Sequence, residues 1–431
     1  MTVTQPSILE SGHGLFNTHV TLEDVEHVIQ EQFKTVSKLG RNTKLTVVGE
    51  GNGIMSRIIL VEPEWTVPDD HLPLKFILKI PFCLHMQGLI EKMRATNPMT
   101  KEQEAGLWMM FETEVQGVHN REININKIME KWNKSDVLLC PKLYFSKQFD
   151  SENKSKGFIG MEYAEGASVR HMFMNVKPRE LYPVLKSLAH FQAGGLLLTD
   201  EELKSISGFD LEKMAGTLMN EDGIKGMLQQ TREMNPERFT EKVNKIESFG
   251  YEIVNFELGC HLNKYMGIQK DVVVHGDLWA PNILWTEKNG RFSVNKVIDF
   301  AGIHLGNPVE DIVRLFVSTL SGSDRQKYWE KLLEKFYEYF LEALNKEAAP
   351  YTLEQLKESY RCYFVFGGIA LFPMFGHVAQ AKLMGCTETD KLLEYKEVIT
   401  EKMECLLEDV TRWHLHSRNV TKNYKKPVSR N

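Results

Sequence analysis

Three short apolar runs in the middle of this 431-residue chain each border on a polar group, and they constrain the fold more than any other feature. The runs are Val272–Val274, Ile283–Trp285 and Val297–Ile298. The polar residues beside them are His275, Asp277, Asn282 and Asp299. Asn289-Gly290 separates the second run from the third, and Asn-Gly between apolar stretches is the strongest short-range signal for a β-hairpin. We therefore expect Asp277, Asn282 and Asp299 to converge at one end of a small hairpin.

The order and spacing of these polar residues match what phosphoryl transfer from ATP requires. The pattern H-x-D-x-x-x-x-N followed by D-F runs from His275 to Phe300. A carboxylate must orient the attacking hydroxyl group, and Mg²⁺ needs oxygen ligands such as a carboxylate and an Asn amide. We predict Asp277 and His275 as catalytic residues, and Asn282 and Asp299 as Mg²⁺ ligands. The alternative is a hairpin whose acids only cap turns.

The composition limits the partners of the chain. A hydrophobic content of 42% and a charged content of 26% are ordinary for a globular protein. The net charge of -6 argues against a nucleic-acid-binding surface. The length is sufficient for one large domain or for two lobes with cores of their own. Only the stretch from Arg418 to Arg430 is basic. We interpret it as a flexible tail, with a membrane or partner contact as the alternative.

The cysteines and the apolar stretches indicate a cytoplasmic protein. Six cysteines lie far apart, without the close spacing of a zinc site, so we expect reduced thiols. The first residues show no basic segment followed by an apolar run, as a signal peptide would. The most apolar stretch, Phe364–Phe375, is too short to cross a bilayer, and we expect no membrane span.

The N-terminal third has the pattern of a sheet with helices. Thr21 to Asp24 fits a capping box that begins a helix. Predicted strands cover residues 45–48, 58–61, 74–80, 142–147 and 158–163. Between the first two strands lies a glycine-rich turn with Gly49, Gly51 and Gly53, where backbone N–H groups can approach phosphate without interference from Cβ. Alone this turn is weak support, but it precedes the other motifs in the expected order.

A lysine and a carboxylate should form the phosphate anchor. Lys79 lies late in the third strand, where kinases hold the α- and β-phosphates, and the alternative is an ordinary edge lysine. An acid on the predicted helix 101–132 should pair with it. Glu122 is followed by apolar residues and lies near the buried face, whereas Glu112 and Glu114 fit a solvated face.

The fifth strand ends where a nucleotide-binding hinge is expected. Ala164-Glu165-Gly166 breaks the strand pattern directly after Tyr163. We predict that Glu162 and Tyr163 contact the adenine through the backbone, and the alternative is a plain strand end. Beyond this point the chain is mainly helical, with Asp311 and Arg314 at the start of the predicted helix 309–319. Asp311 could hydrogen-bond the backbone of the His275 loop, and the alternative is a simple electrostatic interaction of the acid with the helix N-terminus.

Five stretches of the sequence resemble the kinase-like superfamily that includes choline kinases and aminoglycoside phosphotransferases. They are VVGEGNGIMSRIILVEP, HNREININKIMEKW, IGMEYAEGASVRHMF, HGDLWAPNILW and IDFAGIHLGNPVEDIVRLF. The resemblance is closest to the nematode and arthropod branch called CHK-like or ecdysteroid-kinase-like. It implies an α+β, bilobal, protein-kinase-like fold, with a five-stranded antiparallel sheet and a helix in the N-lobe and a mainly helical C-lobe that carries the catalytic hairpin. The predicted limits are 1–161 and 162–417 for the lobes and 418–431 for the tail.

The resemblance also implies roles for single residues. Asp277 would be the catalytic base, Asn282 and Asp299 would bind Mg²⁺, and Lys79 with Glu122 would anchor the phosphates of ATP. Two departures from the family pattern affect the nucleotide loop and the orientation of the substrate. They are Ala301, where the family often has Gln, and a glycine turn unlike G-x-G-x-x-G-x-V.

The predicted reaction is the ATP- and Mg²⁺-dependent phosphorylation of a small-molecule hydroxyl group. A sterol-like alcohol, an amino alcohol and a xenobiotic alcohol all remain open as acceptors, as does the oligomeric state. One alternative is a catalytically inactive kinase fold that binds a nucleotide or another ligand. A protein kinase is a further alternative, but H-G-D in place of H-R-D and the lack of an evident A-P-E segment argue against it.

Overall fold

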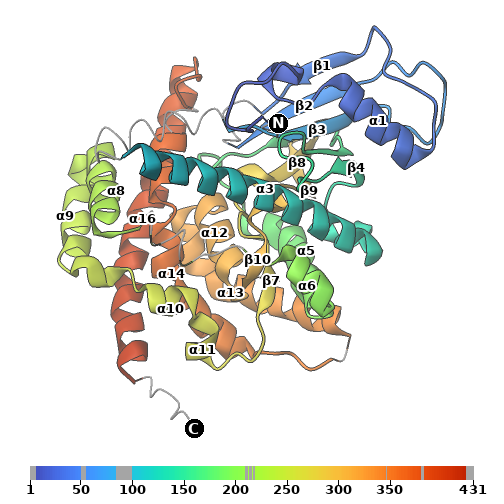
Figure 1. Ribbon diagram of the computed structural model, residues 1–431. Helices are drawn as coiled ribbons and strands as arrows, with labels where there is room; N and C mark the ends of the chain where they lie inside the picture. Colours follow the sequence, from blue (N-terminus) through green and yellow to red (C-terminus); the bar gives the residue numbers. More distant parts are fainter. Residues whose placement is uncertain are drawn as a thin grey trace. The chain divides into compact units, whose positions relative to one another are not determined.

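The computed structural model describes residues 6–49, 55–83, 100–208, 212, 216, 219–345, 347–379 and 383–423 (Figure 1). The chain forms two compact units. The first unit comprises residues 1–134, 140–165 and 202–208, and the second comprises 135–139, 166–201 and 209–431. The predicted α+β class, with an antiparallel five-stranded sheet and a mostly helical remainder, is confirmed. The lobe limits 1–161 and 162–417 stay a prediction.

The first unit is built on an antiparallel sheet with the strand order β1-β2-β3-β5-β4. Its strands are β1 (Lys44–Val47), β2 (Ser56–Glu62), β3 (Phe76–Pro81), β4 (Leu143–Lys147) and β5 (Phe158–Glu162). Its helices are η1 (Leu15–Asn17), α1 (Leu22–Phe33) and α3 (Lys101–Lys131). All five predicted strands are therefore present, within two residues of their predicted ends, because alternating apolar residues identified the buried face.

Helix α1 supplies one layer of the first unit's core. It begins with the predicted capping box, in which Thr21 Oγ1 accepts from the Asp24 N–H at 3.3 Å and the Asp24 carboxylate accepts from the Thr21 N–H at 2.9 Å. Such a box satisfies two N–H groups that a helix start leaves unpaired. Val25 and Ile29 of α1 then pack with Ile59 of β2 in one buried cluster.

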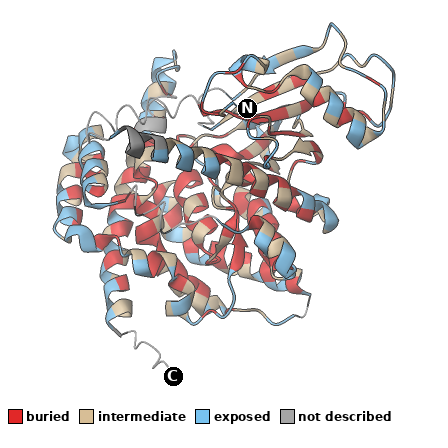
Figure 2. Cartoon of the chain, viewed as in Figure 1, coloured by how far each residue is buried: buried red, intermediate tan, exposed pale blue. Residues whose placement is uncertain are grey.

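The second unit is mainly helical. Its helices are α4 (Ser135–Leu138), η2 (Pro178–Leu181), α5 (Tyr182–Gly195), α8 (Glu221–Met234), α9 (Pro236–Glu247), η3 (Gly250–Ile253), α10 (Phe256–Cys260), α11 (Leu262–Met266), η4 (Ala280–Asn282), η5 (Phe300–Gly302), α12 (Glu310–Thr319), α13 (Gly322–Leu344), α14 (Leu353–Ile369), η6 (Met374–Val378) and α16 (Thr389–Asn423). Helix α6 (Asp200–Ile206) spans the boundary at residues 201 and 202. Figure 2 shows buried residues gathered on the inner faces of these helices, with exposed residues outside.

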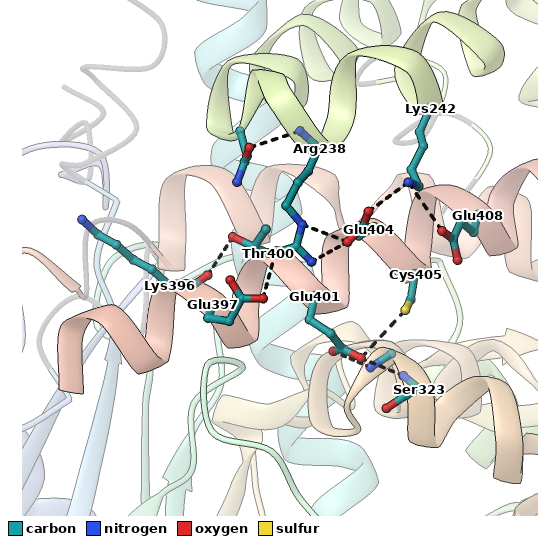
Figure 3. Close-up of polar contacts among 12 residues, drawn as sticks. Arg238, Lys242, Ser323, Lys396, Glu397, Thr400, Glu401, Glu404, Cys405 and Glu408 are labelled. Carbon is teal, nitrogen blue, oxygen red and sulfur yellow. Dashed lines mark hydrogen bonds and ion pairs between the residues drawn. The ribbon is translucent and has the colours of Figure 1, made fainter. Parts of the chain in front are cut away.

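Charged contacts join α9 to the part of helix α16 between Glu397 and Glu408 (Figure 3). Arg238 of α9 pairs with Glu404 and, at 2.7 Å, with Glu397. Lys242, one turn further on, lies 2.9 Å from Glu404 and 3.5 Å from Glu408. Single surface pairs contribute little, but linked pairs hold a helix more firmly. Because α16 runs to Asn423, the first part of the predicted tail 418–431 is helical, and the rest lies outside the described residues.

Three short strand pairings in the second unit position the loops that follow. β8 (Ile283–Lys288) and β9 (Arg291–Val297) form the predicted hairpin. β6 (Ala167–Val169) pairs with the edge of β8 that faces away from β9. Its turn residues Asn289 and Gly290 have φ of 53° and 71°, as a type I′ turn requires at both central positions. β7 (Val272–Val274) pairs separately with β10 (His304–Gly306).

Two general features of the described residues complete the fold. None of the described helices has the length and apolar character needed to span a bilayer. No disulfide joins the six cysteines, all of which lie in the described part of the chain.

Candidate active site

The segment between β7 and β8 turns sharply at a glycine. Gly276 has φ of 79°, and a Cβ added there would lie 2.0 Å from the backbone O of Gly302. Gly302 belongs to η5, which follows Asp299 directly. Only a residue without a side chain allows the two backbone segments this close, so Gly276 brings the Asp277 loop against the Asp299 loop.

Replacing Gly276 tests this close approach. We expect Gly276→Ala to lower the free energy of unfolding by more than Gly290→Ala, as measured by chemical denaturation. Gly290 also has a positive φ, but nothing lies within 4 Å of its would-be Cβ, so that variant carries backbone strain alone, about 1–2 kcal/mol. Equal losses in the two variants would show that the contact with Gly302 does not constrain the loop.

Asp277 is held by two side chains of the second unit. Asn282 Nδ2 donates to Asp277 Oδ2 at 2.9 Å and to the Asp277 backbone O at 2.8 Å. Arg314 Nη1 lies 3.1 Å from Asp277 Oδ1. Each carboxylate oxygen therefore has one fixed partner, while 36% of the side chain stays exposed. The carboxylate is oriented and still reachable by a small molecule.

The surroundings of Asp277 tune its basicity. Dense packing around the carboxylate raises the pKa of Asp277, the charge of Arg314 opposes the rise, and the charge of Asp299 adds to it. The net direction is upward. A carboxylate with a raised pKa accepts a proton more readily than an ordinary aspartate does.

Asp311 accepts hydrogen bonds from two successive backbone N–H groups of the His275 loop, as the sequence suggested. Its Oδ2 accepts from the His275 N–H at 2.8 Å and its Oδ1 from the Gly276 N–H at 2.9 Å. The side chain is 1% exposed and lies in the first turn of α12. Burial raises the pKa of Asp311 to about 6, against the two N–H donors, which lower it. These two hydrogen bonds fix the position of Gly276, the residue directly before Asp277.

We expect Asp311→Asn to destabilise the protein. An amide has one acceptor oxygen, so one of the two buried N–H groups loses its partner, at a cost of about 1–3 kcal/mol at neutral pH. The deficit should widen as the pH falls from 6 toward 4, because the folded wild type takes up a proton on Asp311 before the unfolded chain does. Denaturation at both pH values, with the exposed Asp271→Asn as control, measures this. A variant as stable as the wild type at both pH values would contradict the stabilising role of these two hydrogen bonds.

His275 is enclosed, and both of its ring nitrogens contact backbone groups. It is 1% exposed, its Nδ1 accepts from the Asp277 N–H at 3.2 Å, and its Nε2 then donates to the Ile298 O at 3.2 Å. Burial lowers the pKa of His275 to about 4, so the ring is neutral at neutral pH. Its contacts tie the Asp277 backbone to the end of the β8–β9 hairpin.

Asn282 and Asp299 lie at the same end of that hairpin. β8 begins directly after Asn282, and the Ile298 N–H donates to the Asn282 O at 3.0 Å, one residue before Asp299. Asp299 itself has φ of 68°, a conformation that non-glycine residues seldom adopt and that clusters at functional sites. The three polar residues converge as the hairpin signal predicted.

The first unit contains the predicted lysine–carboxylate pair. Lys79 Nζ donates to both carboxylate oxygens of Glu122, at 2.8 and 2.7 Å. Lys79 is 8% exposed and Glu122 2%, so Lys79 is not an ordinary edge lysine. Removing one partner of such a buried pair typically costs about 3–5 kcal/mol. The other acids are engaged elsewhere: Glu112 accepts from the Ile8 N–H and Glu114 pairs with Arg121.

The remaining predicted nucleotide contacts are only partly described. Gly49 has φ of 67° with open space around its would-be Cβ, whereas Gly51 and Gly53 lie outside the described residues. Glu162 ends β5, and its N–H donates to the Lys142 O at 2.9 Å, so an adenine contact through this N–H would have to replace that bond. Tyr163 follows directly after the strand.

Sequence reasoning missed the contact between Arg314 and Asp277. It placed Arg314 only at the start of a helix. Asp311 and Arg314 are three residues apart on α12 and therefore share a face. Since Asp311 was expected to reach the His275 loop, that spacing could have predicted that Arg314 reaches the same loop.

Comparisons with known proteins bear on the chain as a whole. A model of the DUF1679 family, described as "Uncharacterized oxidoreductase dhs-27", matches residues 8–418. The Caenorhabditis elegans protein of that name is 25% identical over 337 residues, which are 75% of this chain and 38% of that protein. An uncharacterized kinase-like protein of Caenorhabditis elegans is 24% identical over 227 residues, 52% of this chain and 57% of that protein. The chain thus spans less than two thirds of either relative.

Solved structures of phosphotransferases are similar to the chain as well. The GDP complex of wild-type aminoglycoside 2'-phosphotransferase-IIIa is 14% identical, with a TM-score of 0.43, and the similarity covers 89% of this chain and 98% of that one. A choline kinase from Cryptosporidium parvum Iowa II is 14% identical, with a TM-score of 0.48 and coverage of 92% and 97%.

Proposed function

The chain belongs to the DUF1679 family, and we propose that it is a phosphotransferase that moves the γ-phosphoryl group of ATP to a hydroxyl group of a small molecule. The observation that carries the proposal is the fixed carboxylate of Asp277, oriented by Asn282 and Arg314 at the end of the β8–β9 hairpin. Asp311 also has both oxygens held, but it is buried, whereas 36% of the Asp277 side chain stays exposed to a substrate. Phosphoryl transfer needs a carboxylate that is both fixed and accessible, because its catalysis depends on positioning.

In this proposal Asp277 is the catalytic base. The acceptor hydroxyl group donates to the Asp277 carboxylate, which orients the oxygen toward the γ-phosphorus and takes its proton. The new bond joins that oxygen to phosphorus, the bond to the bridging oxygen breaks, and ADP leaves. Arg314 keeps the carboxylate oriented, while the upward shift in the pKa of Asp277 favours proton uptake.

Asn282 and Asp299 fit the binding of Mg²⁺. The Asn282 amide nitrogen is engaged by Asp277, which leaves the amide oxygen as the atom that can face a cation. The Asp299 carboxylate adds a charged oxygen ligand, and hard cations prefer such a donor set. Bound Mg²⁺ would neutralise charge on the phosphates of ATP. We assign both residues to this role.

We assign Lys79 to the α- and β-phosphates, with Glu122 holding its side chain extended, and Gly49, Gly51 and Gly53 to the phosphate-binding turn. The backbone of Glu162 and Tyr163 would contact the adenine. His275, predicted above as catalytic, is better described as a positioning residue, since it is buried and both ring nitrogens bind backbone groups. It acts by fixing Asp277.

The first relative is named an oxidoreductase, but the match covers 38% of that protein. Nicotinamide-dependent oxidoreductases with the common dinucleotide-binding fold use a parallel sheet and the fingerprint G-x-G-x-x-G. The strand pairings in the described residues are antiparallel, and the sequence has no such fingerprint. These observations favour phosphoryl transfer over hydride transfer.

A turnover assay on the full chain tests the proposal. Purified protein with ATP and Mg²⁺ is offered a panel of hydroxylated small molecules that includes sterols, amino alcohols and xenobiotic alcohols. We expect at least one class to raise ADP formation above the rate without acceptor. ATP binding without acceptor-dependent ADP formation across the panel would favour the catalytically inactive alternative instead.

A further inference from the structure

Three metal-ligating side chains lie together in the second unit, and none of them belongs to the candidate active site. Glu358 and Cys362 are one helical turn apart on α14, and His416 is on α16, which packs beside α14 (Figure 1). One ligand atom from each residue lies within 4.8 Å of the other two. A carboxylate oxygen, a thiol sulfur and an imidazole nitrogen are the donors that zinc sites in proteins use.

Small shifts of the side chains would bring the three ligand atoms to the spacing of a tetrahedral site. His416 Nε2 lies 2.6 Å from Glu358 Oε1, and Cys362 Sγ lies 3.9 Å from the same oxygen. Zinc bonds of about 2.0 Å to nitrogen and oxygen and about 2.3 Å to sulfur place neighbouring ligand atoms roughly 3.3–3.8 Å apart. The sulfur–oxygen distance is therefore already close to this range, and the hydrogen bond from His416 has to open by less than about 1 Å.

Two of the three ligands would be anionic when a dication is bound. Burial would raise the pKa of Glu358, but hydrogen bonds from His416 and Arg361 outweigh burial and lower it, so the carboxylate is ionised. Arg361 Nη1 holds Glu358 Oε2 at 2.9 Å, which leaves Oε1 facing the other two ligands. Burial and the charge of Glu358 raise the pKa of the Cys362 thiol. A bound dication would displace the thiol proton, and the thiolate and carboxylate would then balance its charge.

We propose that Glu358, Cys362 and His416 bind a zinc-type divalent cation that ties α16 to α14. The thiolate and imidazole favour zinc over Mg²⁺ or Ca²⁺, which prefer oxygen ligands alone. Side-chain exposures of 30% for Glu358 and 37% for His416 give the ion a path from solvent, and a water molecule can complete the tetrahedron. The site is independent of the proposed phosphoryl transfer.

Cobalt(II) absorption of the 431-residue chain tests the site, after treatment with chelator and reductant. Cobalt(II) replaces zinc in tetrahedral sites, and a cobalt–thiolate bond gives a charge-transfer band in the near ultraviolet. The variants are Cys362→Ser and His416→Gln. Cys405→Ser is the matched control, because Cys405 Sγ lies 3.8 Å from Glu401 Oε1 at the same spacing along a helix (Figure 3).

The wild type and Cys405→Ser should bind one equivalent of cobalt(II) with the band, which zinc then displaces. Cys362→Ser should lose the band. The zinc affinity of His416→Gln should fall at least roughly tenfold. Mutation of a residue that only hydrogen-bonds a metal ligand already lowers metal affinity by about 10- to 100-fold, so the loss of a ligand should cost no less. His416 is partly exposed, so this variant is informative even if Cys362→Ser folds poorly. No band in the wild type, or undiminished zinc affinity in His416→Gln, would overturn the proposal.

Discussion

Replacing Asp277 by Asn is expected to lower kcat about 10²- to 10⁴-fold, the range that a positioned general base contributes. The substitution keeps the size of the side chain but removes the atom that takes the proton. In the wild type, Asn282 Nδ2 donates to Asp277 Oδ2. In the variant an amide nitrogen at that place cannot accept this hydrogen bond, so a loss of stability of about 1 kcal/mol should accompany the change. The affinity for ATP should not change, because Asp277 acts on the acceptor.

The measurement is steady-state turnover with an acceptor found in the panel, together with calorimetric titration of ATP in the presence of Mg²⁺. Asp271→Asn is the matched control, since Asp271 is exposed in the same unit and hydrogen-bonds only Asn263 among the described contacts. Control turnover should equal that of the wild type. If Asp277→Asn turned over at the wild-type rate, its assignment as the base would be wrong.

Replacing Asp299 by Asn is expected to remove most of the effect of Mg²⁺ on ATP binding. Asn tolerates the positive φ of 68° at this position, so the backbone should not be strained further. The charged oxygen ligand is lost, and we expect ATP affinity in the presence of Mg²⁺ to fall at least roughly tenfold, the lower range for damage to a metal site. ATP affinity in the presence of chelator should stay the same.

Titration of ATP with and without Mg²⁺, for the wild type, Asp299→Asn and Asp271→Asn, separates these effects. Asp271→Asn should retain the full effect of Mg²⁺. An equal gain from Mg²⁺ in the wild type and in Asp299→Asn would exclude Asp299 as a ligand, and the assignment of Asn282 beside it would then lose its support.

Local patterns in the sequence were sufficient for much of the fold. Alternating apolar residues located the strands of the first unit, and Asn289-Gly290 located the β8–β9 hairpin, because such signals depend on neighbouring residues alone. Glu122 could be chosen from several acids because apolar residues follow it on the helix. The resulting pair with Lys79 is present and buried.

Contacts between distant segments were beyond the sequence. Arg314 reaches Asp277 across 37 positions, and the close approach of Gly276 to Gly302 depends on two loops that meet only in the folded chain. The sequence predicted reduced thiols, because no two cysteines have the close spacing of a zinc site. Cys362 instead meets His416, which is on a different helix, and only packing of α14 on α16 brings them together.

The transfer of an isotopically labelled phosphoryl group tests the central claim most directly. The wild-type chain is incubated with Mg²⁺ and ATP whose γ-phosphoryl group carries heavy oxygen, together with the panel of hydroxylated small molecules, and the products are analysed by mass spectrometry. We predict a phosphomonoester that carries the labelled group, formed by the wild type and by Asp271→Asn at equal rates and by Asp277→Asn at least about 100-fold more slowly. A labelled product formed equally by Asp277→Asn, or no labelled ester from any acceptor in the wild-type reaction, would contradict the account.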